Sequence, residues 1–306
     1  MAPVANPPFS LAGASDFRHQ LQVANRYTIV WLTILLYEHL STFDDELRHI
    51  WKADWTLFQI LFLFNRYGSL VIVTIASVLT LAEIPSSVCE KIAWILPFSG
   101  VFVVLVCDAI MSLRIHALYD KSRTISLLLA VSVIVEACVM IAVSTRLEEA
   151  LVLPPIARAV FRFEGCAIRA KDAEEAGLIN SLFWSAPLVV ATMFLGLTLY
   201  RTVRASRGTA RMPLYERFLV GQLKWFVIIA MTHLANVILI SQRGQPTIQT
   251  MNVTASIVLT SVCTSRLVLG FYGSGDEPRS TGTVTTLSTL GKNRGGDLIL
   301  LEDRHA

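Results

Sequence analysis

Residues 124–145, TISLLLAVSVIVEACVMIAVST, decide the fold class, because they form an apolar run long enough to cross a lipid bilayer. Spanning the hydrocarbon core takes about 20 mostly apolar residues. Lipid offers the backbone no hydrogen bonds, so such a run must be helical. Glu136 is the one charged residue in it. We therefore expect a transmembrane helix with a single carboxyl group near its middle.

Six further runs of the same character lie on either side of this segment. The predicted membrane helices are 23–42, 55–82, 92–113, 124–145, 178–200, 218–241 and 247–272. The first is the weakest, because Arg26, Glu38 and His39 interrupt it. The sequence thus predicts an all-α integral membrane protein, a seven-transmembrane-helix bundle over residues 23–272.

The composition agrees with this class. Hydrophobic residues make up 54% of the chain and charged residues 16%, whereas a soluble domain carries roughly 25% charged residues. The net charge of +3 is too small to indicate nucleic-acid binding. We expect the lipid bilayer to be the main surroundings of the protein, in the plasma membrane or an endomembrane.

The distribution of lysine and arginine predicts the orientation. These residues are more frequent in 43–54, 114–123, 201–217 and the tail 273–306 than in the segments between them, and cytosolic segments carry the excess. We therefore expect an extracellular N-terminal tail over 1–22 and a cytosolic C-terminus. The tail 273–306 is rich in Gly, Ser and Thr, a composition typical of disorder.

The clearest single signal is the basic segment 201–217, RTVRASRGTARMPLYER. If a cytosolic signalling partner binds the protein, we expect it to contact the arginines of this segment, which include Arg201, Arg204, Arg207 and Arg211.

Cysteine placement predicts one disulfide. Cys107, Cys138 and Cys263 lie inside predicted helices, where packing is the usual role. Cys89 and Cys166 lie outside them, in segments predicted to face the oxidising side of the membrane. We expect a bridge between these two; the alternative is a pair of free thiols.

Ionisable residues inside membrane helices are costly and mark candidate sites. Glu38 and Asp108 fall near the cytosolic ends of the first and third helices, and Arg66 lies deeper in the second; helical side-chain direction brings their charged groups to one depth. We predict an intramembrane polar cluster in which Arg66 pairs with Asp108 or Glu38. A structural role is favoured, with a conformational lock as the sharper alternative.

A second set of polar residues predicts a ligand cavity open to the outside. Glu136 lies near the membrane midplane and is either a ligand or proton site or a protonated carboxyl bonded to a neighbouring helix. The others fall in the outer halves of the last three helices: Asn180, His233, Asn236, Gln249 and Asn252. Ordinary hydrogen bonding between helices explains these residues equally well.

Signals of an enzyme are absent from the sequence. It contains no H-E-x-x-H, no G-x-S-x-G and no phosphate-binding loop, and its six histidines are scattered. We expect no catalytic residue, no metal and no cofactor.

Two stretches carry a family resemblance. The first contains Tyr37-Glu38, Thr42 to Glu46, Trp51, and Phe62 to Tyr67 in the pattern F-x-x-N-R-Y, and the second is LRIHALYDKSR at 113–123. On these motifs the chain resembles the basidiomycete fungal seven-helix membrane proteins that carry domain of unknown function 6533. Family members usually have Asp where this chain has Glu38. The resemblance implies a seven-helix layout and an outer Gly165-Cys166 pair, but no activity, cofactor or partner.

A receptor-like protein is the leading functional interpretation, with a small-molecule or lipid ligand bound from the outer face. The Cys89–Cys166 bridge would resemble the loop-to-helix bridge of G-protein-coupled receptors, and segment 201–217 and the tail would face coupling partners. This is an analogy of fold, which does not establish function. The alternatives are a transporter or channel that uses Glu136, Arg66 and Asp108, and a structural membrane protein without a ligand.

Overall fold

The computed structural model describes residues 11–52, 55–82, 86–152, 169–170, 173–206, 213–241 and 246–273. The elements within them are, in chain order, α1 (Leu11–Ser41), α2 (Phe43–His49), α3 (Leu57–Leu81), α4 (Ser86–Leu118), α5 (Arg123–Ala150), β1 (Leu151–Val152), β2 (Arg169–Ala170), α7 (Ala173–Ser206), α8 (Pro213–Ser241) and α9 (Pro246–Gly273). The two short strands pair antiparallel. The described part of the chain is therefore helical except for this strand pair and the turns.

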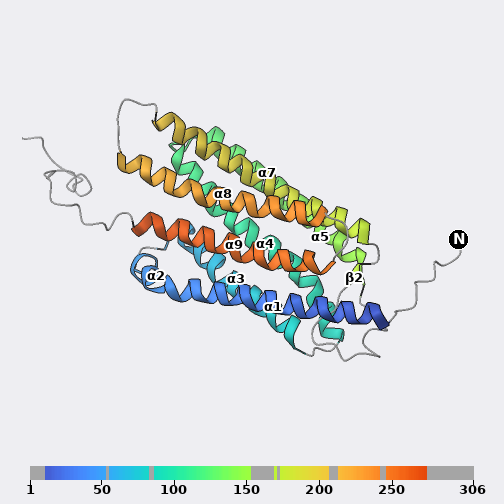
Figure 1. The fold of residues 1–306 in the computed structure, drawn as a ribbon. Coiled ribbons are helices and arrows are strands. Elements are labelled where there is room, and N and C mark those ends of the chain that lie inside the picture. The colour runs from blue at the N-terminus through green and yellow to red at the C-terminus, as the bar shows by residue number, and fades with distance from the viewer. Residues whose placement is uncertain are drawn as a thin grey trace, which may run out of the picture.

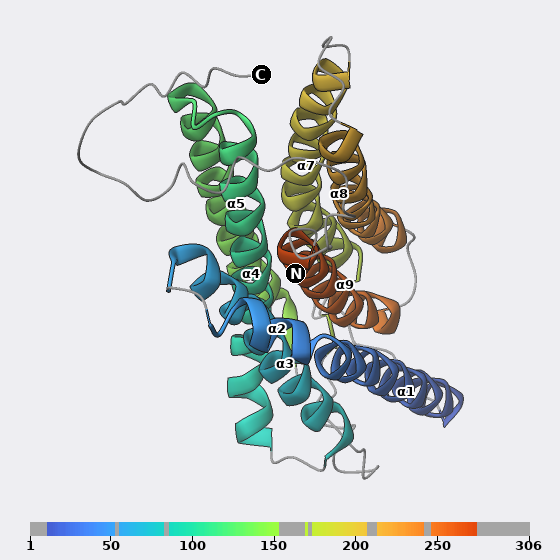
Figure 2. The same ribbon diagram turned by 90° about the vertical axis from the view of Figure 1, so that its left-hand side faces the viewer.

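The long helices of the described residues, α1, α3, α4, α5, α7, α8 and α9, lie side by side and alternate in direction, so that α1 begins and α9 ends at opposite ends of the bundle (Figure 1). They follow one another around the bundle in chain order, and α9 completes the ring by packing against both α8 and α1 (Figure 2). The short helix α2 lies at the end of the bundle where α1 finishes and α3 begins. We call this the α2 end.

The helix α9 packs against α1, α3, α4 and α8, and its apolar stretch is the most buried of the five, at 67%. Small side chains let helix backbones approach closely, and their hydroxyls bond across the contact. The buried polar residues of α9 are all of this kind: Thr254, Ser256, Thr260, Ser261, Thr264 and Ser265. The sequence of α9 is thus suited to the interior of a bundle.

Local chemistry explains where two of the helices start. Thr56 caps α3: its hydroxyl accepts a bond from the Gln59 backbone N–H, and the Gln59 side chain accepts one from the Thr56 N–H at 2.7 Å. The tight turn from α4 into α5 places Asp120 and Lys121 at φ of 53° and 59°, a left-handed conformation that Asp tolerates better than most residues.

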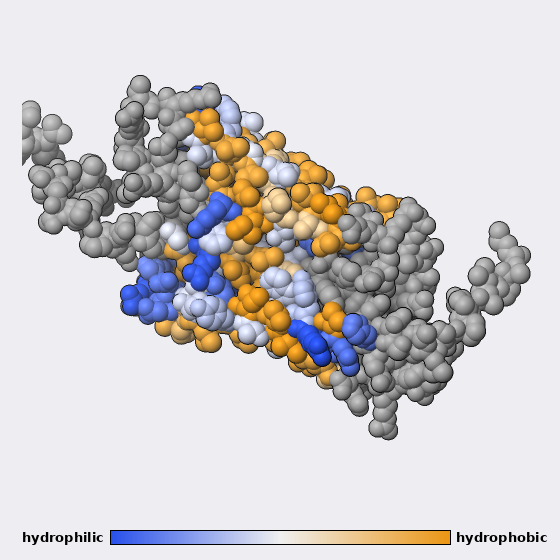
Figure 3. All heavy atoms as spheres, viewed as in Figure 1, coloured by the Kyte–Doolittle hydropathy of each residue, from blue (hydrophilic) through white to orange (hydrophobic). Residues whose placement is uncertain are grey.

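The surface of the bundle suits lipid. Five stretches are long and apolar enough to cross a membrane, namely Leu57–Leu79, Pro97–Leu118, Arg123–Arg146, Gly177–Arg204 and Val253–Gly270. Large apolar side chains are exposed on them, among them Leu127 and Ile134 of α5. On the face in Figure 3, apolar side chains cover much of the middle, and hydrophilic ones gather mainly toward the α2 end. These features identify a membrane protein with several spanning helices.

The structure differs from the sequence-based expectation at several points. The predicted N-terminal tail 1–22 is not a tail throughout, because α1 already begins at Leu11. A polar helix, α2, occupies part of the expected connection 43–54, and α7 continues to Ser206, into the basic segment. In α8 the described apolar stretch, Leu223–Leu239, is shorter than the five spans. Residues 274–306, most of the predicted tail, lie outside the described residues.

Candidate functional site

The helix α2 positions a buried glutamate at the α2 end. Its first turn holds Asp44, Asp45 and Glu46, and its last turn Arg48 and His49, which matches the polarity of the helix dipole. Asp44 and Arg48 pair at the surface, whereas the Glu46 side chain turns inward and is 0% exposed. This short, polar helix therefore brings a carboxyl group beneath the apolar bundle.

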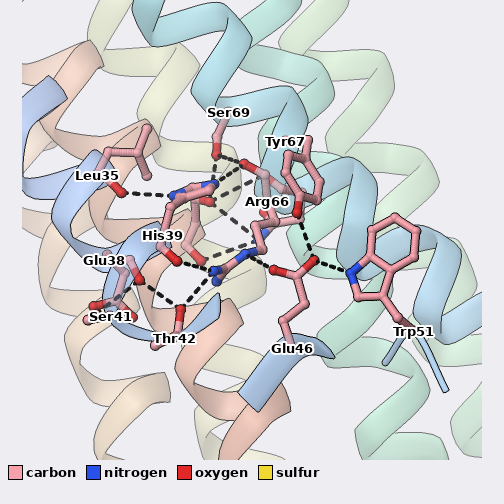
Figure 4. Close-up of polar contacts among 12 residues, drawn as sticks. Leu35, Glu38, His39, Ser41, Thr42, Glu46, Trp51, Arg66, Tyr67 and Ser69 are labelled. Carbon is pink, nitrogen blue, oxygen red and sulfur yellow. Dashed lines mark hydrogen bonds and ion pairs between the residues drawn. The ribbon is translucent and has the colours of Figure 1, made fainter. Parts of the chain in front are cut away.

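Arg66 of α3 meets this carboxyl group. Its Nε lies 2.7 Å from Glu46 Oε2, and its Nη2 donates to the Thr42 hydroxyl at 2.7 Å and to the His39 carbonyl at 2.9 Å (Figure 4). The guanidinium also lies against the Phe62 ring, 5.9 Å from its centroid. An arginine buried at this depth is tolerable only with such partners.

The second oxygen of Glu46 is also occupied. Its Oε1 accepts hydrogen bonds from Trp51 Nε1 at 3.0 Å and from the Tyr67 hydroxyl at 2.9 Å (Figure 4). Three donors thus surround one carboxylate: Trp51 follows α2, and Arg66 and Tyr67 are consecutive residues of α3. We call Glu46, Arg66, Trp51 and Tyr67 the Glu46 lock.

The predicted pairing of Arg66 with Asp108 or Glu38 is wrong. Glu38 instead makes a two-pronged ion pair with Arg266 of α9, at 2.5 Å from Nε and 2.9 Å from Nη2. The partner of Arg66 is instead Glu46, a carboxyl group that does not belong to any predicted membrane helix. The helix α2 folds this residue back under the bundle.

Asp108, the third member of the predicted cluster, has a different neighbour. It is buried on α4 and interacts with the buried Glu136 of α5. Both Glu136 oxygens and Asp108 Oδ2 have no hydrogen-bond donor among the described residues. Two carboxylates have no hydrogen to offer each other, so a bond between these groups requires a shared proton.

Hydroxyl groups of α9 connect the interior. Ser261 bonds Ser69 of α3 at 2.7 Å and also meets Asn65, while Thr264 meets the Cys107 thiol of α4 at 2.8 Å. Near the α2 end, Arg114 of α4 donates to the Leu267 carbonyl at 2.5 Å. The helix α9 is therefore joined by polar contacts to most of its neighbours.

The polar residues predicted to line an outer cavity are only partly within the described side chains. Asn180, His233 and Asn236 are buried, and Asn236 donates to Ser256 of α9. His233 stacks on Trp184 at a centroid separation of 5.8 Å. Trp184 was not predicted as part of this site, because a mostly apolar side chain inside a membrane helix gives no polar signal in the sequence. The side chains of Gln249 and Asn252 lie outside the described residues, and the cavity stays a prediction.

The basic segment contributes one contact between helices. Arg201, near the end of α7, lies 2.6 Å from Asp120 in the α4–α5 turn and over the Tyr119 ring. The Tyr119 hydroxyl donates to the Leu197 carbonyl of α7 at 2.9 Å. Arg204 donates to the Tyr200 hydroxyl on its own helix. Arg207 and Arg211 lie outside the described residues.

The predicted disulfide also falls outside the part of the chain that can be assessed. Neither the Cys89 side chain nor Cys166 is among the described groups. The described cysteines, Cys107, Cys138 and Cys263, are free thiols. The Cys89–Cys166 bridge therefore stays a prediction.

Comparison with protein families identifies a match in the first part of the chain. Residues 25–71 match a family described as "Family of unknown function (DUF6533)". The matched segment contains the whole Glu46 lock as well as Glu38, His39 and Thr42. A search of curated proteins found no match. The part of the chain with a recognised family signature is thus the part that builds the buried ion pair.

Proposed function

We propose that this protein is a receptor-like seven-helix membrane protein with its N-terminus outside and the α2 end in the cytosol. The proposal includes α1 and α8 as spanning helices in addition to the five apolar stretches. It rests on the alternating direction of the seven long helices and on the placement of arginine. A tag after Ala306 that is digested by protease in intact cells would contradict this orientation.

The observation that carries the receptor interpretation is the set of ion pairs at the α2 end. A receptor needs helix ends that have two arrangements and a ligand that favours one of them. The ion pair at the centre of the Glu46 lock, Arg66 with Glu46, is fully buried and would act as a fixed anchor for α1, α2 and α3. The Glu38–Arg266 and Arg201–Asp120 pairs are partly exposed, so they are weak enough to open.

In this proposal the end of α7 is the moving part. Arg201 holds α7 to the α4–α5 turn through Asp120, whose side chain is 82% exposed. Opening this contact would free the arginines of the basic segment for an acidic surface on a signalling partner. The ligand, a small molecule or a lipid, would bind near Asn180, His233 and Asn236 in the opposite half of the bundle. We propose no catalytic activity and no cofactor.

The test is nucleotide exchange by a panel of purified Gα subunits on the full chain in lipid nanodiscs. Asp120→Asn removes the contact that restrains α7 and should raise basal exchange several-fold above the unmodified chain. Asp44→Asn is the matched control, because Asp44 also forms an exposed ion pair with an arginine, but within α2 alone. No exchange on any Gα subunit with either chain would contradict the receptor proposal.

The transporter alternative with Glu136, Arg66 and Asp108 on one pathway is less well supported. Arg66 faces Glu46, Thr42 and His39, whereas Asp108 and Glu136 face each other between α4 and α5. The predicted bridge of Cys89 and Cys166 is kept in the proposal as a clamp on the outer loop. Peptide mapping without reductant should find the two cysteines linked.

A further inference from the structure

The helix α4 has a polar stripe that the proposed function does not use. Asp108, Ser112 and His116 follow one another at intervals of four residues, so they share one side of the helix over about 12 Å. Each has one polar atom buried without a hydrogen-bond partner in the described part of the chain: Oδ2, Oγ and Nδ1 respectively. The stripe ends two residues before α4 does.

The neighbouring helix continues this stripe. The helices α4 and α5 are antiparallel, and Asp108 meets Glu136. A residue a given number of positions after Asp108 on α4 therefore lies at the level of the residue the same number of positions before Glu136 on α5. Ser132, one turn before Glu136, therefore lies at the level of Ser112. Its hydroxyl donates to the Leu129 carbonyl, and its lone pairs remain able to accept.

Unpaired polar atoms on successive turns indicate room for hydrogen-bonded water. Buried polar groups in proteins are nearly always paired with protein or with ordered water. Here the unpaired atoms run from a pair of carboxyl groups to a histidine beside the α4–α5 turn. Ser112 and His116 are only partly buried, in contrast to Asp108 and Glu136. The exposure of these side chains thus increases toward the α2 end.

We propose that Asp108 and Glu136 form a proton-binding site that exchanges with water at the α2 end along Ser112 and His116. Binding adds one proton to a carboxylate oxygen and forms a hydrogen bond between the two groups; release returns that proton to water, and no other bond changes. The pair then carries one negative charge in place of two. This assignment is independent of the receptor proposal.

Other groups that face the pair do not supply a countercharge. The Cys107 thiol beside it already bonds Thr264 of α9, and Arg114 on α4 reaches the Leu267 carbonyl. Arg66 of α3 is engaged by Glu46. The described groups of α5 and α9 that act on Asp108, Glu136 or Cys107 are carboxyl, thiol and hydroxyl groups. A proton is the small cation that best satisfies two opposed carboxyl groups without further ligands.

The experiment is infrared spectroscopy of the full chain in lipid nanodiscs. The unmodified protein should show the carbonyl band of a protonated carboxyl group, and both Glu136→Gln and Asp108→Asn should abolish it. After transfer to D2O the band should shift, and Ser112→Ala or His116→Phe should slow that shift about tenfold. Ser144→Ala is the control: Ser144 is buried on α5 on the other side of Glu136, and should leave the rate unchanged.

Three results would overturn the proposal. The first is a spectrum in which neither carboxyl variant removes a protonated-carboxyl band. The second is an exchange rate that is the same in the Ser112, His116 and Ser144 variants. A band that appears only after sodium is replaced by choline would also overturn it, because the pair would then hold a metal cation. If Ser112→Ala does not fold, Ser112→Cys provides the same comparison.

Discussion

Glu46 and Glu136 are both glutamates with buried side chains, and their surroundings are opposite. Glu46 is met by a guanidinium, an indole N–H and a phenol hydroxyl. Glu136 is met by another carboxyl group and by no described donor. Burial alone therefore does not determine what a glutamate contributes to the fold; the groups that face it do. The α2 end is held by complementary charge, whereas the α4–α5 contact requires a proton.

The largest effect should follow from breaking the buried ion pair on one side only. Arg66→Ala leaves the Glu46 carboxylate buried and unpaired, which should cost about 3–5 kcal/mol of stability. The double variant Arg66→Met with Glu46→Gln removes both charges and should be less damaging. Monodisperse yield and melting temperature in detergent measure both, and equal losses in the two variants would argue against a charged pair.

A smaller effect should follow from removing one donor of the Glu46 lock. Tyr67→Phe deletes the hydroxyl that donates to Glu46 Oε1 and should cost about 1.5–3 kcal/mol, the range for a hydrogen bond to a charged group. Phe64→Tyr does not touch the lock and offers a control on an exposed aromatic position of the same helix. A melting temperature unchanged by Tyr67→Phe would show that Glu46 does not depend on this donor.

The Glu38–Arg266 pair should contribute less, because water reaches it. The Arg266 side chain is 42% exposed, so Arg266→Gln should cost about 1 kcal/mol or less. The difference from the unmodified chain should shrink as salt is added, since exposed charges are screened. Melting curves at low and high salt test this expectation. A loss of stability that does not depend on salt would show that the ion pair is shielded from water.

The smallest effect is expected at the α4–α5 turn. Asp120→Asn removes the charge that meets Arg201 but keeps a residue that tolerates the positive φ. We expect a change of stability within about 0.5 kcal/mol. Asp120→Val, which disfavours this backbone conformation, should be clearly worse. Similar melting temperatures for the two variants would mean that the turn is not strained by a branched side chain.

The sequence predicts the helices well where apolar runs are long and poorly where polar residues form helix. The span predicted at 55–82 corresponds to α3, which begins at Leu57 and ends at Leu81. By contrast α1 starts twelve residues before the predicted 23, because hydropathy marks the lipid-facing part of a helix and not its polar extension. The segment FDDELRH has acidic residues first and basic residues last, an order typical of a helix. Its seven residues are too few to show a helical periodicity in the sequence.

The candidate site shows a similar limit. Glu38, Arg66, Asp108 and Glu136 are predicted from the sequence to be costly in lipid, and all four are buried. Their partners were not predictable from depth alone, because Glu46 and Arg266 reach them from α2 and from the far end of the chain. Pairing depends on which helices are neighbours, and that information enters only with the three-dimensional arrangement.

The most direct test makes the same substitution at both buried glutamates. Glu46→Gln strands the Arg66 guanidinium without a counter-charge and should lower stability by about 3–5 kcal/mol. Glu136→Gln places an amide beside Asp108, where its N–H can donate in place of the shared proton, and should cost no more than about 1 kcal/mol. The account predicts a much larger drop in melting temperature for Glu46→Gln, measured in one detergent and buffer. Equal drops, or a larger one for Glu136→Gln, would contradict it.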